Sequence, residues 1–315
     1  MDIIPHMFRL IKSAIKNVAF QLLIHFFEKK KTLNGTQRIG VSTLLCHRHV
    51  DIFIYNLQSL FYQIHKNLPI YIIDDGTLTT RDINKLKTYF SITIESSTSS
   101  EKKITKLFHK YNNIYRFRFD TDVCAFRKKL DAFFLHPFTK CIYLDADLLW
   151  QSCPREIIQW LETEDDVFLY TAHHINPNTF FGNREAVYQY SCRLLINDHF
   201  SCPIDPSFNS GLLCMPNKQF VQFQKLDEIF RYFYTYRFVY TLVSEETAIY
   251  LAGYYDKMKK LPADQYKNVW AHEEYENTIS KKTVSMHYSG GTKDGVFKRD
   301  ALKLAIRTGL FRKNN

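Results

Sequence analysis

The sequence predicts an α/β fold in which a mostly parallel central sheet is flanked by helices, with an amphipathic helix at each end of the chain. Short apolar runs alternate with helix-spaced segments over the first 170 residues, which is typical of a parallel sheet. No repeat and no linker rich in Pro, Gly or Ser divides the 315 residues. We therefore expect one domain over 34–297, preceded by a basic helix over 1–33 and followed by a basic segment over 298–315.

Each element follows from its apolar pattern and the turn residues that bound it. The expected strands cover 38–46, 69–73, 90–95, 141–144, 167–171, 208–215 and 284–288. The expected helices cover 51–65, 78–90, most of 104–135, 219–236 and 245–252, and the segment 96–100 reads as a polar loop. Ligands of such sheets bind beyond the carboxyl ends of the strands, where the carboxylates at 74–75 and 145–147 are expected.

Net charge and cysteine content limit the kinds of ligand and the cellular compartment that we expect. The formal net charge is +10, which favours phosphorylated ligands or an anionic lipid surface. No zinc-finger spacing and no RNA-binding signature is present, so nucleic acid is not expected. The seven cysteines are odd in number and form no C-x-x-C pair, which indicates a reducing compartment rather than a disulfide framework.

Two D-x-D motifs differ in context. Asp145-Ala146-Asp147 stands between the apolar runs 141–144 and 148–150, and carboxylates inside an apolar stretch are costly unless they bind something. Asp120-Thr121-Asp122 instead follows two arginines, which is typical of an exposed, paired surface. We therefore expect a divalent cation at 145–147, because such an ion neutralises a departing diphosphate as a Lewis acid.

A second group follows the last expected strand, where His287 precedes Gly290-Gly291 and Lys293. Glycines let backbone N–H groups approach a phosphate closely, and the lysine supplies a cation. Taken alone, a histidine in such a place is more often structural, and Gly290-Gly291 more often a simple turn.

Three motifs together carry a family resemblance. Tyr143-Leu144-Asp145-Ala146-Asp147 resembles the Y-L-D-A-D motif of glycosyltransferase family 8 and related GT-A enzymes. His287, Gly290 and Lys293 match the H-x-x-G-x-x-K motif of that family, and Phe208-Asn209-Ser210-Gly211 is similar to its F-N-[AS]-G segment. The motifs occur in the expected order, and the resemblance covers about residues 38–295. It implies a GT-A (Rossmann-like) fold and a hexosyltransferase activity.

The resemblance also implies roles for single residues. Asp145, Asp147 and His287 would ligate Mn²⁺ or Mg²⁺, while Gly290 and Lys293 would hold the diphosphate of a nucleotide-sugar. The donor is expected to be a UDP-sugar, with Asp145 and Ala146 also close to it.

Two further positions are implied to contact the sugars. Asn209 would contact the donor sugar or the acceptor. Lys128 or Lys129 would take the place of the family's basic donor-contacting residue. The acceptor is expected to be a saccharide, a glycolipid or a protein.

The chain departs from family 8 at three places. Asp294-Gly295 follow Lys293 in place of P-W, and Glu245-Glu246 replace a D-Q pair. Asp74-Asp75-Gly76-Thr77 is similar to the D-D-G-S turn of family 2, where such residues contact the nucleotide. We therefore expect Asp74 and Asp75 to bind uracil or ribose, the alternative being a simple turn.

Three readings of the chemistry stay open. The family favours transfer with retention, whereas an inverting transfer would need Glu245 or Glu246 as the base; both glutamates are also good residues for a helix start. A sugar nucleotidyltransferase usually carries a Gly-rich loop after the first strand, but Cys46-His47-Arg48-His49 stand there. A third reading is a non-catalytic, membrane-associated binding protein.

Both termini are basic and amphipathic, over 1–31 and from Lys298 onward. Such segments lie on anionic membranes, the alternative being that they pack on the domain. No apolar run reaches the length of a membrane span. We expect a cytoplasmic protein that docks on the inner face of the membrane.

Overall fold

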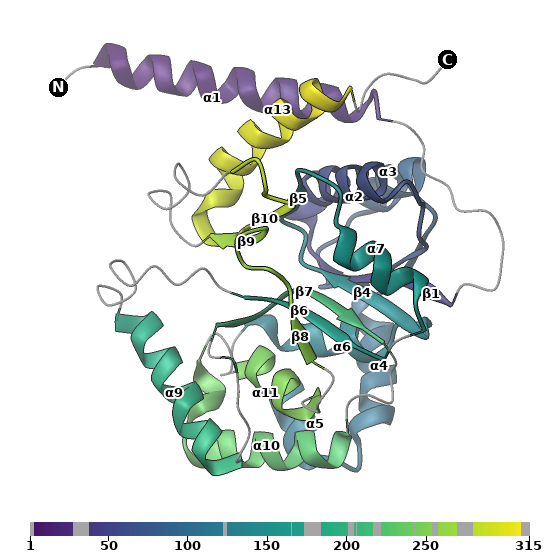
Figure 1. Ribbon diagram of the computed structural model, residues 1–315, viewed down its shortest axis with the longest axis vertical. Coiled ribbons are helices and arrows are strands. Elements are labelled where there is room, and N and C mark those ends of the chain that lie inside the picture. The colour runs from purple at the N-terminus through teal and green to yellow at the C-terminus, as the bar shows by residue number, and fades with distance from the viewer. Residues whose placement is uncertain are drawn as a thin grey trace.

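The computed structural model describes residues 3–27, 38–121, 125–164, 166–172, 184–200, 205, 207–216, 222–241, 244–253, 258–269 and 280–309. Their helices and strands form the expected α/β architecture (Figure 1).

The strands fall into two sheets. The central sheet contains β1 Ile39–Leu45, β2 Ile70–Asp74, β3 Ile92–Glu95, β4 Lys140–Leu144, β6 Phe168–Ala172, β7 Phe208–Met215 and β8 Met258–Lys260. The smaller sheet contains β5 Leu148–Trp150, β9 Tyr266–Val269 and β10 Ser285–Tyr288.

The α-helices are α1 Ile3–Ile24, α2 Val50–Ile64, α3 Thr80–Tyr89, α4 Ser97–Phe108, α5 Asn112–Phe119, α6 Lys129–Phe134, α7 Arg155–Glu162, α9 Arg184–Phe200, α10 Phe223–Thr235, α11 Ser244–Gly253 and α13 Lys298–Thr308. Short 3₁₀ turns are η1 His47–His49, η2 Ala125–Lys128, η4 Phe238–Tyr240 and η5 Gly290–Thr292, and η6 Lys293–Phe297 is a π-helical turn.

The central sheet has the strand order β3-β2-β1-β4-β7-β6-β8. Its neighbours pair in parallel except β7, which is antiparallel to β4 and to β6. The expectation of a mostly parallel sheet is thus confirmed. Because β1, β2 and β4 run in the same direction, their carboxyl ends meet at one edge.

Each face of the central sheet is covered by its own core. Ile70 and Ile72 of β2 pack into the core that includes α2 and α13, whereas Tyr71 and Ile73 pack into the core that includes α4, α5 and α10. Strands buried on both faces need continuous apolar runs, and this explains why they were recognisable in the sequence.

One expectation about the elements is wrong, and several elements escaped prediction. Residues 97–100 form the start of α4 rather than a loop, and Ser96 caps that helix by accepting a hydrogen bond from Ser99 N at 3.3 Å. A serine run reads as a loop, yet serine is also a preferred N-cap. The strands β5, β8 and β9 were missed because segments of three or four residues show no usable periodicity.

The smaller sheet joins two distant parts of the chain. β5 follows the 145–147 turn directly, and β10 pairs with it antiparallel so that His287 lies opposite Leu148. Tyr288 N donates to Asp147 O at 3.0 Å. This strand pairing places His287 beside the 145–147 turn.

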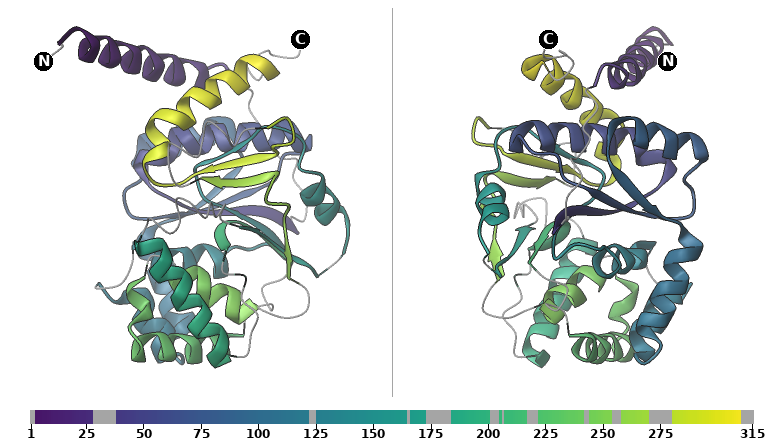
Figure 2. Two further views of the ribbon diagram at one scale, coloured as in Figure 1. Left: turned by 60° about the vertical axis from the view of Figure 1, so that its left-hand side comes forward. Right: turned by 90° about the vertical axis from the view of Figure 1, so that its right-hand side faces the viewer.

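The two terminal helices lie together at one end of the molecule, opposite α9 and α10 (Figure 1; Figure 2). Phe20 of α1 is fully buried; its ring stacks on Tyr55 with centroids 4.1 Å apart and meets Phe297 edge-on. One face of α1 therefore packs on the domain. None of the helices in the described part of the chain has the apolar length that crossing a bilayer requires.

Candidate metal and diphosphate site

The turn between β4 and β5 is held by backbone and side-chain hydrogen bonds. Asn56 of α2 donates through Nδ2 to Asp145 O at 2.9 Å and to Ala146 O at 3.3 Å. Asp145 N donates to Gly211 O at 2.8 Å. The turn is fixed from α2, β7 and β10, so both carboxylates leave it in defined directions.

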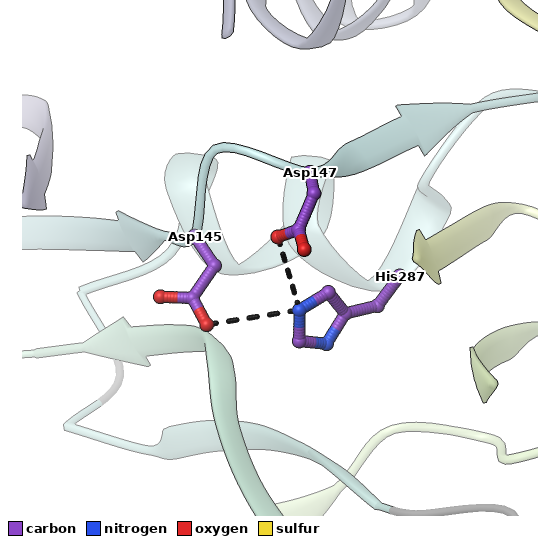
Figure 3. A group of neighbouring side chains, drawn as sticks. All are labelled: Asp145, Asp147 and His287. Carbon is purple, nitrogen blue, oxygen red and sulfur yellow. Dashed lines mark ion pairs between the residues drawn. The ribbon is translucent and has the colours of Figure 1, made fainter. Parts of the chain in front are cut away.

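Three side chains converge at this turn. His287 Nε2 lies 3.2 Å from Asp147 Oδ1 and 3.6 Å from Asp145 Oδ2 (Figure 3). One donor atom from each of the three residues lies within 4.8 Å of the others. Two carboxylates and an imidazole at such spacing are a suitable donor set for one divalent ion.

Gly211 makes room for the imidazole. A Cβ at position 211 would stand 2.3 Å from His287 Cε1 and 2.6 Å from Nδ1. Side chains do not approach so closely, so any other residue would push the ring away. The motif Phe208–Gly211 therefore needs its glycine in order to seat the histidine of another motif.

Two lysines balance the charge of the carboxylates. Lys293 Nζ lies 2.9 Å from Asp147 Oδ2, and Lys129 Nζ lies 3.0 Å from Asp145 Oδ2. Burial acts to raise the pKa of Asp147, but His287 and Lys293 outweigh it and hold that pKa well below its usual value. Asp147 is thus an anion at neutral pH although its side chain is 3% exposed.

The residues fit a divalent cation. The Nε2 atom of His287 faces both carboxylates, whereas its Nδ1 is buried with no hydrogen-bond partner among the residues described. Carboxylate oxygens suit Mg²⁺ and Mn²⁺, and an imidazole ligand favours Mn²⁺ of the two. Tyr143 OH donates to the second oxygen of Asp145, Oδ1, at 2.8 Å, which orients that carboxylate.

Lys128 and Lys129 occupy different places. Lys129 Nζ lies in the site, with Ser210 Oγ at 3.2 Å and Glu245 Oε1 at 4.0 Å besides Asp145. Lys128 Nζ points to the loop after β2, where it donates to Asp75 O at 2.7 Å and to Ser97 Oγ at 2.8 Å. Of the two lysines left open by the sequence, Lys129 is the neighbour of the metal cluster.

Glu245 and Glu246 lie in the first turn of α11 and contact different groups. Both oxygens of Glu246 are occupied, one by the Arg193 guanidinium and the other by Ser210 N at 2.9 Å. Glu245 is 2% exposed, and burial raises its pKa to about 7 despite the opposing charge of Lys129. Glu246 is therefore an ion-paired structural carboxylate, whereas Glu245 is the one whose protonation changes near neutral pH.

Asp74 and Asp75 stabilise their own turn at the end of β2. Asp74 Oδ1 accepts from Gly76 N at 2.8 Å and from Leu78 N at 3.1 Å, and Asp75 Oδ1 accepts from Thr77 N at 2.9 Å. These turn contacts use only Oδ1 of each carboxylate. The turn follows β2, whose carboxyl end lies at the same sheet edge as that of β4. Their contact with a nucleotide stays a prediction.

Gly290 and Asn209 belong to the two motifs that meet at His287. Gly290 has φ +62°, a conformation that favours glycine, and a Cβ there would meet nothing within 4 Å. Asn209 is buried, and its Oδ1 accepts from Gly211 N at 2.9 Å. The geometry leaves open space at Gly290. Seven residues further along the chain, η6 ends at Phe297, which contacts Phe20 of α1.

Comparison with known proteins shows the fold. No protein-family model matches the chain, and no curated protein matches its sequence. The solved structure of the galactosyltransferase LgtC with donor and acceptor sugar analogues is similar at TM-score 0.50 and 12% identity, over 88% of this chain and 97% of that one. The fold is that of the GT-A glycosyltransferases.

Two further solved structures are similar to this chain at lower TM-scores. Mouse xyloside xylosyltransferase 1 in its apo form has TM-score 0.49 and 12% identity, over 82% of this chain and 99% of that one. The bifunctional glycosyltransferase WbbM has TM-score 0.48 and 12% identity over 88% of this chain, which spans 51% of that protein.

Several residues around the candidate site could not be predicted from the sequence. Asn56, which holds the metal turn, lies inside an ordinary helix pattern, and Arg193 pairs with Glu246 from a segment that matched no motif. Asp131, on α6 next to Lys129 and Leu130, forms a buried ion pair with Arg118 and does not reach the carboxylates. Asp122 of the second D-x-D motif lies outside the described residues, as do 173–183 and 201–204.

Proposed function

We propose that the chain is a metal-dependent glycosyltransferase that moves a hexose from a nucleotide-sugar, UDP-linked, to a saccharide, glycolipid or protein acceptor. The observation that carries this proposal is the cluster of Asp145, Asp147 and His287 at the carboxyl edge of a GT-A sheet. Ligands of such sheets bind at that edge.

Charge neutralisation is the task of the site. Asp145, Asp147 and His287 would hold Mn²⁺ or Mg²⁺, which supplies the positive charge that a leaving diphosphate requires. Lys293 stands 2.9 Å from Asp147, so its ammonium is available to a phosphate beside the ion. Open space at Gly290 gives the diphosphate a place against the backbone.

Retention is the stereochemistry that the glutamates support. Glu246 has both oxygens occupied inside the protein, which disfavours it as a base for an acceptor hydroxyl. Glu245 is buried, and its Oε1 lies 4.0 Å from the ammonium of Lys129. We assign Glu245 the task of positioning Lys129 against the donor sugar, and the leaving phosphate the task of accepting the proton.

The test is hydrolysis and transfer from a panel of nucleotide-sugars, with and without Mn²⁺, in parallel with thermal unfolding. A donor that raises the melting temperature only when Mn²⁺ is present identifies the nucleotide, because a ligand of the folded state stabilises it. In Asp147→Asn, the Mn²⁺ concentration needed to produce this stabilisation should rise by at least roughly a hundredfold.

Asp120→Asn is the matched control, since Asp120 belongs to the other D-x-D motif and accepts instead from Tyr234 OH at 3.2 Å. Loss of activity in Asp147→Asn alone supports the proposal. Equal metal response in both variants would contradict it. Reaction of a nucleoside triphosphate with a sugar phosphate would indicate a nucleotidyltransferase instead.

A further inference from the structure

Helix α1 carries an exposed apolar stripe that the catalytic site does not use. The α1 stripe consists of Ile11, Ile15, Val18 and Leu22 of α1 and of Phe26 in the turn that follows it, all between 46% and 63% exposed. Steps of three and four residues place side chains on one face of a helix. Nothing in the described part of the chain buries this face.

The opposite face of α1 fixes the direction of the stripe. Phe20, Ile24 and Phe27 are buried in the core shared with α2. Tyr55 OH donates to Phe20 O at 2.8 Å, and Phe27 meets the ring of Tyr55 edge-on. Because this inner face is packed, α1 cannot turn the stripe inward without giving up those contacts.

Positive charge lies beside the stripe. No acidic residue occurs in α1, whereas Lys12 and Lys16 follow Ile11 and Ile15 by one position and so lie along one side of the stripe. The neighbouring α13 contributes Lys298, which donates to Asn17 Oδ1 at 3.1 Å, and Ile306, which is 72% exposed. Four of the eleven residues of α13 are basic and one is acidic.

We propose that the α1 stripe, with the basic residues of α13 beside it, docks the protein on the surface of an anionic lipid bilayer. An apolar face bordered by lysines has the pattern of helices that lie in the plane of a membrane interface. A second copy of the chain is the other occupant of suitable shape, but it would bring one acid-free, basic helix against another. Anionic headgroups match this charge, and acyl chains match the stripe.

The test is flotation of the full-length protein with vesicles that contain phosphatidylglycerol, compared with vesicles of pure phosphatidylcholine. We expect binding to the anionic vesicles that weakens as salt is raised, since salt screens the lysines. Ile15→Ser/Leu22→Ser should lower the vesicle-binding constant by roughly a hundredfold, because leaving one apolar side chain in water costs about a factor of ten in that constant.

Leu194→Ser/Leu195→Ser is the matched control, since both leucines are exposed by 44% and 58% on α9 at the opposite end of the molecule (Figure 1). Unchanged binding in this control and an unchanged melting temperature in both variants support the proposal. Equal binding of the two double variants, or no binding to anionic vesicles at low salt, overturns it. A dimer of the unmodified protein that the stripe variant converts to a monomer would also overturn it.

Discussion

The imidazole of His287 and the backbone of Gly211 are in direct contact, and a Cβ at position 211 would stand 2.3 Å from Cε1 of that ring. The contact joins two motifs that lie 76 residues apart in the sequence. It also makes the candidate metal site sensitive to a single methyl group.

Gly211→Ala should displace His287 and weaken Mn²⁺ binding by roughly tenfold to a hundredfold, the range for residues that orient a ligand. Isothermal titration with Mn²⁺ measures this loss. Gly295→Ala is the control, because a Cβ at 295 meets nothing within 4 Å. Should the two variants bind Mn²⁺ alike, the contact between 211 and 287 does not position the ligand.

Asn56→Ala should destabilise the protein and loosen the metal turn. Asn56 is fully buried; its Nδ2 donates to Asp145 O and Ala146 O, and its Oδ1 accepts from Trp150 Nε1 at 2.9 Å. Loss of these bonds leaves buried polar groups without partners, at a cost of about 2–4 kcal/mol in the free energy of unfolding. Urea denaturation measures it. Asn84→Ala, on an exposed face of α3, should change stability by less than about 0.5 kcal/mol.

Lys129→Met should separate metal binding from catalysis. The ammonium of Lys129 lies 3.0 Å from Asp145 Oδ2 and competes with a cation for that oxygen. Mn²⁺ affinity should therefore stay equal or increase, while the rate of transfer falls by roughly a hundredfold for lack of a group that stabilises developing charge. Lys128→Met, whose ammonium donates to Asp75 O and Ser97 Oγ, should leave Mn²⁺ affinity unchanged. A parallel loss of affinity and rate in Lys129→Met would argue against this role.

Stability should fall as pH rises through neutrality, in part because of Asp300. Burial raises the pKa of Asp300 to about 7, although Lys303 and Lys16 act to lower it, and Tyr288 OH donates to its Oδ2 at 3.1 Å. The folded state holds a proton that the unfolded chain has lost, so this contribution is complete below about pH 4 and disappears as pH rises through about 7.

Asp300→Asn keeps the acceptor for Tyr288 and removes the titration. The free energy of unfolding, measured by urea titration between pH 5 and pH 8, should decline less steeply in this variant. The same slope is compared in Glu245→Gln, where it should also be less steep because the pKa of Glu245 is raised to about 7 as well. An unaltered slope in Asp300→Asn would show that Asp300 is ionised throughout.

The sequence by itself determined the type and order of the main elements. Strands buried on both faces, such as β2 and β4, require unbroken apolar runs, and a carboxylate pair at the end of such a run is conspicuous. The D-x-D of the site was distinguished from Asp120-Thr121-Asp122 on this basis. Those features are local, so a linear pattern is sufficient to reveal them.

Only the tertiary structure decided how distant residues meet. The antiparallel pairing of β10 with β5 brings His287 opposite Leu148, and three-residue strands carry no periodicity that predicts such a pairing. Asn56 of α2 holds the backbone of Asp145, and Gly211 of β7 leaves room for the ring of His287. Sequence spacing does not encode these contacts. Likewise, α1 is apolar on two sides, and only packing of Phe20, Ile24 and Phe27 determined which side remains exposed.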